Sequence, residues 1–274
     1  MRLWKGKNMV CALYSTGTSK NQLSKRGFTL IECMIALLLG SMLSAIAMNM
    51  YLKSADFSRV SKSHQILNDN GSTALTLIGS YIRDAGFSDI TEEIVRNTIM
   101  FNPAECGYGA DNFCSRNYNN KSDVLALQLV PLNQRSCNGV KIDPGEKIVN
   151  VFKVDESEFE LTCSSYSMTK KTWHVRDFPI QSGIEKMQIQ YLLNDATSVS
   201  DPASTQQNSE DVVMGVSVSF LVKSDIENTV TPRARNFKLF DSQNMNVNDA
   251  QLRQVFQSSF LINNIYVRSN LAGQ

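Results

Sequence analysis

Histidine is scarce in this sequence, which has only His64 and His174 among its 274 residues. Neither histidine stands in an H-E-x-x-H pattern, and the sequence has no G-x-S-x-G or P-loop pattern. His64 falls within a predicted helix and His174 follows Trp173 in a predicted strand or turn, where structural or solvated roles are expected. The sequence therefore offers no catalytic residue and no cofactor site, and we expect a protein that is not an enzyme.

Basic charge is also scarce beyond the first 27 residues. That segment holds six of the 27 Lys and Arg residues and none of the 26 Asp and Glu residues, which leaves 21 basic and 26 acidic side chains in the remainder. A remainder with a net charge of about −5 has no clustered cationic surface of the kind that binds nucleic acid regardless of sequence. Direct nucleic-acid binding is therefore not expected.

One long apolar run extends from Gly27 to Leu52, carries Glu32 as its only charge and is closed by Lys53. A helix of roughly 25 residues spans the ~30 Å hydrocarbon layer of a membrane. Lys25 and Arg26 directly precede the run, so the short N-terminal side is expected to stay in the cytoplasm and the remainder to be exported. We therefore predict a transmembrane segment over residues 28–52.

The position of the processing site follows from what surrounds this run. No A-x-A-like signal-peptidase site follows Met50, so cleavage is expected before the apolar residues. The junction reads Lys25-Arg26-Gly27-Phe28-Thr29-Leu30-Ile31-Glu32, and it resembles the class III leader junction of type IV pilins and type II secretion pseudopilins. The resemblance implies that residues 1–27 are a leader, that prepilin peptidase cuts between Gly27 and Phe28, and that the Phe28 amine is methylated. An uncleaved signal anchor is the alternative, and translation can begin at Met1 or Met9.

A carboxylate inside a membrane helix needs an explanation, because it costs on the order of 3 kcal/mol to insert. Cleavage creates an amine at Phe28, and residues four apart share one helix face, so Glu32 would lie beside that amine. In a stack of subunits, Glu32 of one chain can pair with the Phe28 amine of its neighbour and set the axial register. Glu32 is therefore the predicted assembly residue. The alternative is that its side chain extends to the membrane interface.

The helical pattern continues after the apolar run as an amphipathic helix over residues 53–86. Its apolar positions recur at three-, four- and seven-residue steps: Val60, Leu67, Ala74, Ile78, Tyr81 and Ala85. Asp69-Asn70-Gly71 predicts a kink or a loosened turn, since glycine costs ~1 kcal/mol in a helix interior. Gly86 predicts the end of the helix, because it can adopt the left-handed conformation.

The remainder, residues 87–274, is predicted to be a β-rich extracytoplasmic domain. Strands are expected at Ser122–Val130, in a hairpin of Lys147–Val154 with Glu158–Cys163, and at Lys186–Leu193, Val212–Val222 and Val255–Val267. Two polar stretches, Asn194–Asp211 and Ser224–Asp249, are predicted to be surface loops.

Four cysteines fall in this domain once Cys11 and Cys33 are set aside. An even number in an exported domain predicts two disulfides, for which four cysteines allow three connectivities. We favour Cys106–Cys114, which closes a short loop, and Cys137–Cys163, which the hairpin can bring together. Zinc is the competing interpretation, but there is no C-x-x-C pair. Oxygen donors for calcium occur at Asp111, Asn112, Asn117, Asn119, Asn120 and Asp123 without the glycine-bearing loop, so no metal is predicted.

The order of the elements extends the resemblance over nearly the whole chain after Lys25. The segments Tyr81–Phe87, Ser122–Leu125, Gly183–Tyr191 and Leu252–Phe256 resemble the PilW family of minor pilins. This implies an α+β, type IV pilin-like fold, in which a long N-terminal helix, transmembrane and then amphipathic, packs against a β-rich domain. It also implies a single-pass inner-membrane protein with its C-terminal domain in the periplasm, which enters the pilus after assembly.

The implied function is that of a structural minor pilin that takes part in priming type IV pilus assembly and so supports motility, adhesion or DNA uptake. Its implied partners are prepilin peptidase, other minor pilins, the major pilin and the inner membrane. The alternative is a GspJ-like pseudopilin of a type II secretion system. A membrane-anchored enzyme or receptor is a third hypothesis, which would leave Gly27 and Glu32 unexplained.

Overall fold

The computed structural model describes residues 28–87, 98–101, 106–107, 112–195, 197–199, 213–226 and 231–265. The predicted leader, Gly27 and its cleavage junction lie outside these residues. The chain divides into two compact units, residues 1–52 and residues 53–274, and the second is called the C-terminal unit below.

Helix α1 runs from Leu30 to Asp84 and contributes to both units. It begins two residues later than predicted, because Thr29 is its N-cap: the Thr29 Oγ1 accepts a hydrogen bond from the Glu32 backbone N–H at 3.3 Å. It ends where predicted, since Gly86 adopts a left-handed φ of 73°. The Gly86 N–H then donates to the Gln128 carbonyl at 2.9 Å, which ties the helix end to the sheet.

The apolar part of α1, up to Leu52, has every side chain exposed in its own unit. Three of its polar side chains are satisfied within the helix: Ser41 donates to the Leu38 carbonyl at 2.8 Å, Ser44 to the Gly40 carbonyl at 2.8 Å, and Asn49 to the Ala45 carbonyl at 3.0 Å. Such internal pairing is what a helix in lipid requires. By length and composition, α1 is able to cross a membrane.

The strands of the C-terminal unit form three antiparallel sheets. The first has the order β1 (Leu125–Leu129), β2 (Ile148–Asp155), β3 (Glu160–Ser167) and β4 (Thr172–Ser182). The second has the order β10 (Arg253–Leu261), β7 (Val213–Lys223), β5 (Ile184–Leu193) and β6 (Ser198–Val199). The third pairs β8 (Arg233–Phe237) with β9 (Met245–Asp249). A short 3-10 helix, η3 (Asn263–Ile265), comes after β10 in the chain.

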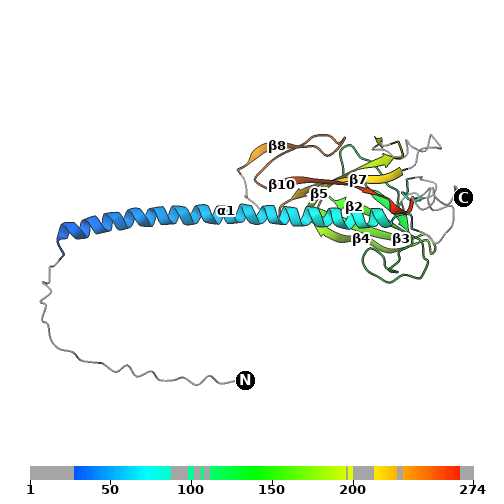
Figure 1. Cartoon of the computed structure of the whole chain (residues 1–274), viewed down its shortest axis with the longest axis horizontal. Helices are drawn as coiled ribbons and strands as arrows, with labels where there is room; N and C mark the ends of the chain where they lie inside the picture. Colours follow the sequence, from blue (N-terminus) through cyan, green and yellow to red (C-terminus); the bar gives the residue numbers. More distant parts are fainter. Residues whose placement is uncertain are drawn as a thin grey trace, which may run out of the picture. The chain divides into compact units, whose positions relative to one another are not determined.

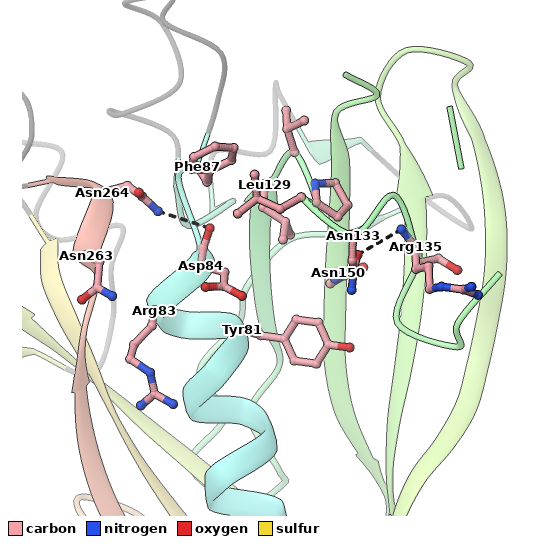
Figure 2. A pocket seen from close by; sticks show the side chains of 14 residues that line it. Tyr81, Arg83, Asp84, Phe87, Leu129, Asn133, Arg135, Asn150, Asn263 and Asn264 are labelled. Atoms are coloured by element: carbon pink, nitrogen blue, oxygen red, sulfur yellow. Dashed lines mark hydrogen bonds between the residues drawn. The ribbon is translucent and has the colours of Figure 1, made fainter. Parts of the chain in front are cut away.

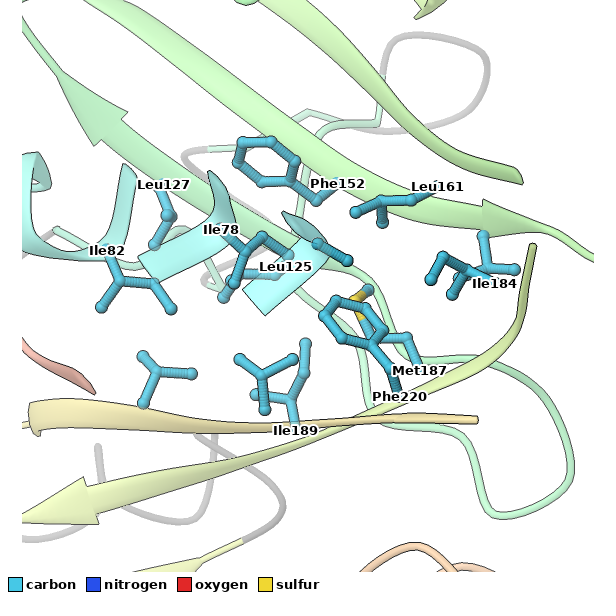
Figure 3. Close-up of a cluster of buried hydrophobic side chains, with 14 of the residues drawn as sticks. Ile78, Ile82, Leu125, Leu127, Phe152, Leu161, Ile184, Met187, Ile189 and Phe220 are labelled. Atoms are coloured by element: carbon cyan, nitrogen blue, oxygen red, sulfur yellow. The ribbon is translucent and has the colours of Figure 1, made fainter. Parts of the chain in front are cut away.

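Both four-stranded sheets pack against the part of α1 that follows Lys53, and this fixes the position of the core (Figure 1). Figure 3 shows Ile78 and Ile82 of the helix between Phe152 on β2 and Ile189 on β5, and all four side chains are at most 1% exposed. Each buried aliphatic side chain of this size stabilises the fold by roughly 1.5–3 kcal/mol. The fold is thus a long N-terminal helix packed on antiparallel β-sheets, as predicted.

Two sequence-based predictions about local structure are wrong. The stretch Ser224–Asp249, predicted to be a loop, contains the β8–β9 hairpin, whose residues alternate between exposed and half-buried. The predicted loop Asn194–Asp211 contains β6, and its residues 200–211 lie outside the described part of the chain. The predicted hairpin over Lys147–Cys163 is confirmed as β2 and β3, and β4 adds a further strand that only the neighbourhood of His174 had suggested.

The helix also continues without interruption through Asp69-Asn70-Gly71, where a kink or loosened turn was predicted. A Cβ on Gly71 would come within 3 Å of the Phe256 ring, and one on Gly79 within 3 Å of the Phe260 ring. These two glycines are therefore recesses that let the aromatic side chains of β10 approach the helix. The neighbouring Asn70 accepts a hydrogen bond from Gln181 Nε2 at 3.0 Å instead of loosening the helix.

Candidate functional site

The N-terminal end of α1 presents the two predicted assembly groups to the outside. Phe28 is 83% exposed, and the Glu32 carboxylate, which is also exposed, forms no hydrogen bond or ion pair with any residue that the structure describes. Because Phe28 precedes the N-cap Thr29, it lies outside the helix. In this uncleaved chain Phe28 and Glu32 therefore do not share one helix face, and their adjacency after cleavage stays a prediction.

Thr29 is a helix-capping residue that the sequence analysis did not identify. Thr29-Leu30-Ile31-Glu32 has the T-x-x-E spacing of a capping box, a signal that marks the start of a helix. A carboxylate at this third helical position also interacts favourably with the helix dipole. Glu32 thus stabilises the helix start while its side-chain oxygens stay open to a partner from another chain.

The four cysteines of the C-terminal unit form two disulfides in the structure. Cys106 is bonded to Cys114 with a Cα–Cα distance of 5.2 Å, and Cys137 to Cys163 with a Cα–Cα distance of 6.4 Å. This is the pairing favoured from the sequence. Cys33 is an exposed free thiol. The second bond attaches the segment around Cys137 to strand β3 and so fixes the loop of residues 131–141.

Two of the candidate calcium donors, Asn112 and Asp123, instead bind backbone N–H groups. Asp111 lies outside the described residues, and Asn112 accepts a hydrogen bond from the Cys114 N–H at 3.0 Å. Asp123 is 1% exposed and accepts N–H bonds from Tyr118 at 2.7 Å and Ile189 at 2.8 Å. Burial raises the pKa of Asp123 to about 7, although these N–H bonds act in the opposite direction. Within the described ranges, no three His, Cys, Asp or Glu residues are grouped to bind a metal.

His174 belongs to a polar cluster around Glu146, whose side chain is 2% exposed. His174 Nε2 lies 2.7 Å and Lys170 Nζ 3.1 Å from the Glu146 carboxylate, and the Ser167 hydroxyl donates to it as well. Burial alone would raise the pKa of Glu146, but these hydrogen bonds outweigh it and lower the pKa to about 2. The cluster joins β3, β4 and the turn before β2, which is a structural role for His174.

Acid should therefore weaken the C-terminal unit through Glu146. Because its folded-state pKa of about 2 lies below the ordinary 4.5, its contribution is complete above pH 4.5 and is lost as the pH falls toward 2. That shift corresponds to about 3 kcal/mol. In urea unfolding of a fragment starting at Lys53, Glu146→Gln should flatten the fall in stability between pH 4.5 and 2. The exposed Glu158→Gln should follow the wild-type curve, and a Glu146→Gln curve parallel to wild type would contradict this role.

A second buried charge group links four strands of the C-terminal unit, β5, β8, β9 and β10. The Arg253 guanidinium, 3% exposed, binds the Glu185 carboxylate with N–O distances of 2.5 and 3.1 Å and Asp249 at 2.7 Å. Arg235 completes the group, 3.3 Å from Asp249. Two of the four segments that carried the resemblance, Gly183–Tyr191 and Leu252–Phe256, thus meet in one ion pair.

A cavity of about 320 Å³ lies at the C-terminal end of α1 (Figure 2). Its walls come from the last helical turn, the residues that follow β1, strand β2 and the segment after β10. The lining residues are Tyr81, Arg83, Asp84, Phe87, Leu129, Val130, Pro131, Leu132, Asn133, Arg135, Ser136, Asn150, Asn263 and Asn264. No sequence motif marks it, because its residues are brought together only by the fold.

Comparison with known proteins agrees with the N-terminal geometry. Residues 23–48 match the family model described as the prokaryotic N-terminal methylation motif. A type IV-like pilin from Thermus thermophilus is structurally similar, with 13% sequence identity and a TM-score of 0.47 over 73% of this chain and 96% of that one. No curated protein matches the sequence. The chain therefore carries a prokaryotic N-terminal methylation motif, which overlaps the start of a helix that is able to cross a membrane.

Proposed function

We propose that the chain is a minor pilin of the PilW type, a non-enzymatic structural subunit that takes part in priming type IV pilus assembly. The observation that carries the proposal is the methylation motif over residues 23–48, which contains a Glu32 carboxylate without a partner among the described residues. A buried charge in a membrane helix is retained for a function. Assembly supplies that function, because a neighbouring subunit can offer the cation.

The cation is the amine of the neighbour's mature N-terminus, which is created at Phe28 when prepilin peptidase cuts after Gly27. At an effective dielectric near 20, an ion pair 4 Å apart interacts by about 4 kcal/mol. That energy is available only to a correctly stacked subunit, so it selects axial register. Exposure of Phe28 and Glu32 at the end of the helix supports this role.

The proposed location is the inner membrane, with the C-terminal unit in the periplasm. Two disulfides support this location, since such bonds persist in oxidising compartments and are rare in the cytosol. The proposed partners are other minor pilins and the major pilin, and the assembled pilus would support motility, adhesion or DNA uptake.

Glu32→Ala should leave cleavage, methylation and membrane insertion unchanged while the number of surface pili falls about tenfold or more, as expected for the loss of 1.4 kcal/mol or more of pairing energy. Intact-mass measurement of the membrane-bound chain should find a methylated Phe28 terminus in both wild type and variant. Cys33→Ala, which changes the adjacent exposed residue, is the matched control and should retain wild-type piliation.

The deletion strain separates the proposed function from its alternative. Deletion should reduce pilus counts in electron micrographs, with major pilin still abundant in the membrane and secreted-enzyme activity unchanged. Normal piliation with lost secretion would instead identify a GspJ-like pseudopilin, and an uncut N-terminus in wild-type membranes would overturn both assignments.

A further inference from the structure

The cavity at the end of α1 has the character of a binding site for one side chain. Its volume of about 320 Å³ is at the lower end for ligand pockets, enough to hold an aromatic side chain with space for its flanks. Apolar surface comes from Phe87, Leu129, Val130, Pro131 and Leu132. Leu132 is 76% exposed at the rim, where its side chain is open to contact with a partner.

One buried polar group in the lining lacks a partner. Asn150 is 1% exposed, and its Oδ1 forms no hydrogen bond with any described residue. Its side chain stands on the helix-facing side of β2, in register with Ser165 of β3 and Leu127 of β1. Leaving such an amide unpaired costs roughly 1–3 kcal/mol, so a ligand that reaches Asn150 with a hydrogen-bonding group recovers that energy.

The ring that faces this amide is Tyr81. Figure 2 shows Tyr81 extending from the last turns of α1 toward the strand that carries Asn150. Its ring packs against Phe152 with centroids 5.0 Å apart, which holds it in place as an aromatic wall. A second ring entering the cavity can stack on Tyr81 or Phe87 and bring a polar tip to Asn150.

Charge at the cavity favours an acidic ligand. Among the described residues that line it, the charged ones are Arg83, Arg135 and Asp84. Arg135 is held in place, since its Nη1 donates to the Gly139 carbonyl at 2.7 Å, and Arg83 lies over the Phe260 ring at 5.6 Å. The loop that carries Leu132 and Arg135 is fixed by the Cys137–Cys163 disulfide, so this wall is formed before any partner arrives.

We propose that this cavity binds a tyrosine side chain from an acidic segment of a partner protein. The phenol ring fits the apolar walls, its hydroxyl pairs with the Asn150 amide, and acidic neighbours of the tyrosine face Arg83 and Arg135. That the partner is a neighbouring pilin subunit rests on the proposed function. The preference for tyrosine is argued from the cavity alone. Peptide binding to the isolated chain measures this preference and does not require pilus assembly.

The test is to measure the binding of short peptides to the full chain in detergent micelles by nuclear magnetic resonance or calorimetry. The probe is acetyl-Glu-Tyr-Glu-amide, compared with the same peptide carrying phenylalanine or flanking lysines. The tyrosine peptide should bind about tenfold more tightly than the phenylalanine peptide, because a site that pairs a hydroxyl discriminates against its absence. The lysine-flanked peptide should be weaker at low salt and approach the acidic one at high salt.

Variants locate the binding. Asn150→Leu should abolish the tyrosine preference, leaving equal affinities for the two aromatic peptides. Leu132→Ser should weaken both, while Val140→Ser, which alters an exposed apolar residue of the same loop outside the lining, should change neither. Equal affinities in wild type, or an unchanged preference in Asn150→Leu, would overturn the proposal, because either result means that Asn150 does not recognise the tyrosine hydroxyl. Binding of p-cresol as tight as that of the peptide would overturn the protein partner in favour of a small phenol. The piliation of the Glu32→Ala strain does not bear on these binding results. The assembly proposal and the tyrosine-binding proposal can therefore be rejected independently of each other.

Discussion

Replacing Arg253 by alanine is expected to lower the free energy of unfolding of the C-terminal unit by about 3–5 kcal/mol. The substitution leaves the Glu185 carboxylate, which is 14% exposed, without its two guanidinium hydrogen bonds. It also separates β10 from Asp249, the last residue of β9. An unpaired carboxylate in a poorly solvated position costs far more than an exposed ion pair contributes.

The experiment is urea unfolding of a fragment that starts at Lys53, with circular dichroism as the signal that reports unfolding. Glu185→Ala in the Arg253→Ala background should restore part of the loss, because the double variant no longer holds an uncompensated charge. Arg233→Ala removes an exposed arginine from β8 and should change the stability by less than about 0.5 kcal/mol. Equal effects of Arg253→Ala and Arg233→Ala would show that the ion pair does not stabilise the fold.

Removing the Cys137–Cys163 disulfide should have the next largest effect. The bond joins residues 26 apart, and closing a loop of that size is worth about 3.5 kcal/mol through the unfolded state. The Cys106–Cys114 bond closes a loop of only eight residues and should contribute about 2.5 kcal/mol. The double variants Cys137→Ser/Cys163→Ser and Cys106→Ser/Cys114→Ser should therefore lower the melting temperature in that order.

Calorimetry of the full-length wild type and of the two double variants checks this order. Reductant should lower the melting temperature of the wild type and leave that of the four-serine variant unchanged. Cys33→Ser, which removes the free thiol, is the control and should melt as wild type does. Thiol labelling that finds all four cysteines of the C-terminal unit reactive in non-reduced protein would contradict the disulfides and favour a metal site.

The helix and the central strands were predictable because their signals are local. Leu67, Ala74 and Ile78 recur at helical spacing, and all three are fully buried. The β2–β3 hairpin follows from two apolar runs separated by a short acidic turn. The methylation motif and Glu32 are equally local, because peptidase recognition and the membrane charge depend on neighbouring residues in the sequence.

The features that the sequence did not reveal depend on distant neighbours. The low helix propensity of Gly71 predicts a weak point in the helix. The structure shows why glycine occupies this position, because the Phe256 ring of β10 leaves no space for a Cβ. The β8 strand reads Arg-Ala-Arg-Asn-Phe and has too few apolar residues for a strand signal, so its pairing with β9 determines its conformation. Nothing in the sequence distinguishes Asn150 from other polar residues, and only the fold brings it and Tyr81 into the lining of one cavity.

The two glycine recesses of α1 also determine how a pulling force passes through the molecule. Gly71 and Gly79 are eight residues apart, about 12 Å along the axis, and each receives a ring from β10. Sliding the helix along its axis would drive both rings against the side chains next to the glycines, so axial tension passes to β10 at two points together. Because β10 is hydrogen-bonded along its length to β7, that load acts in shear on many bonds at once. If the chain assembles into a filament as proposed, a subunit that is pulled by its N-terminal helix would thus resist extraction of the helix from its own sheets.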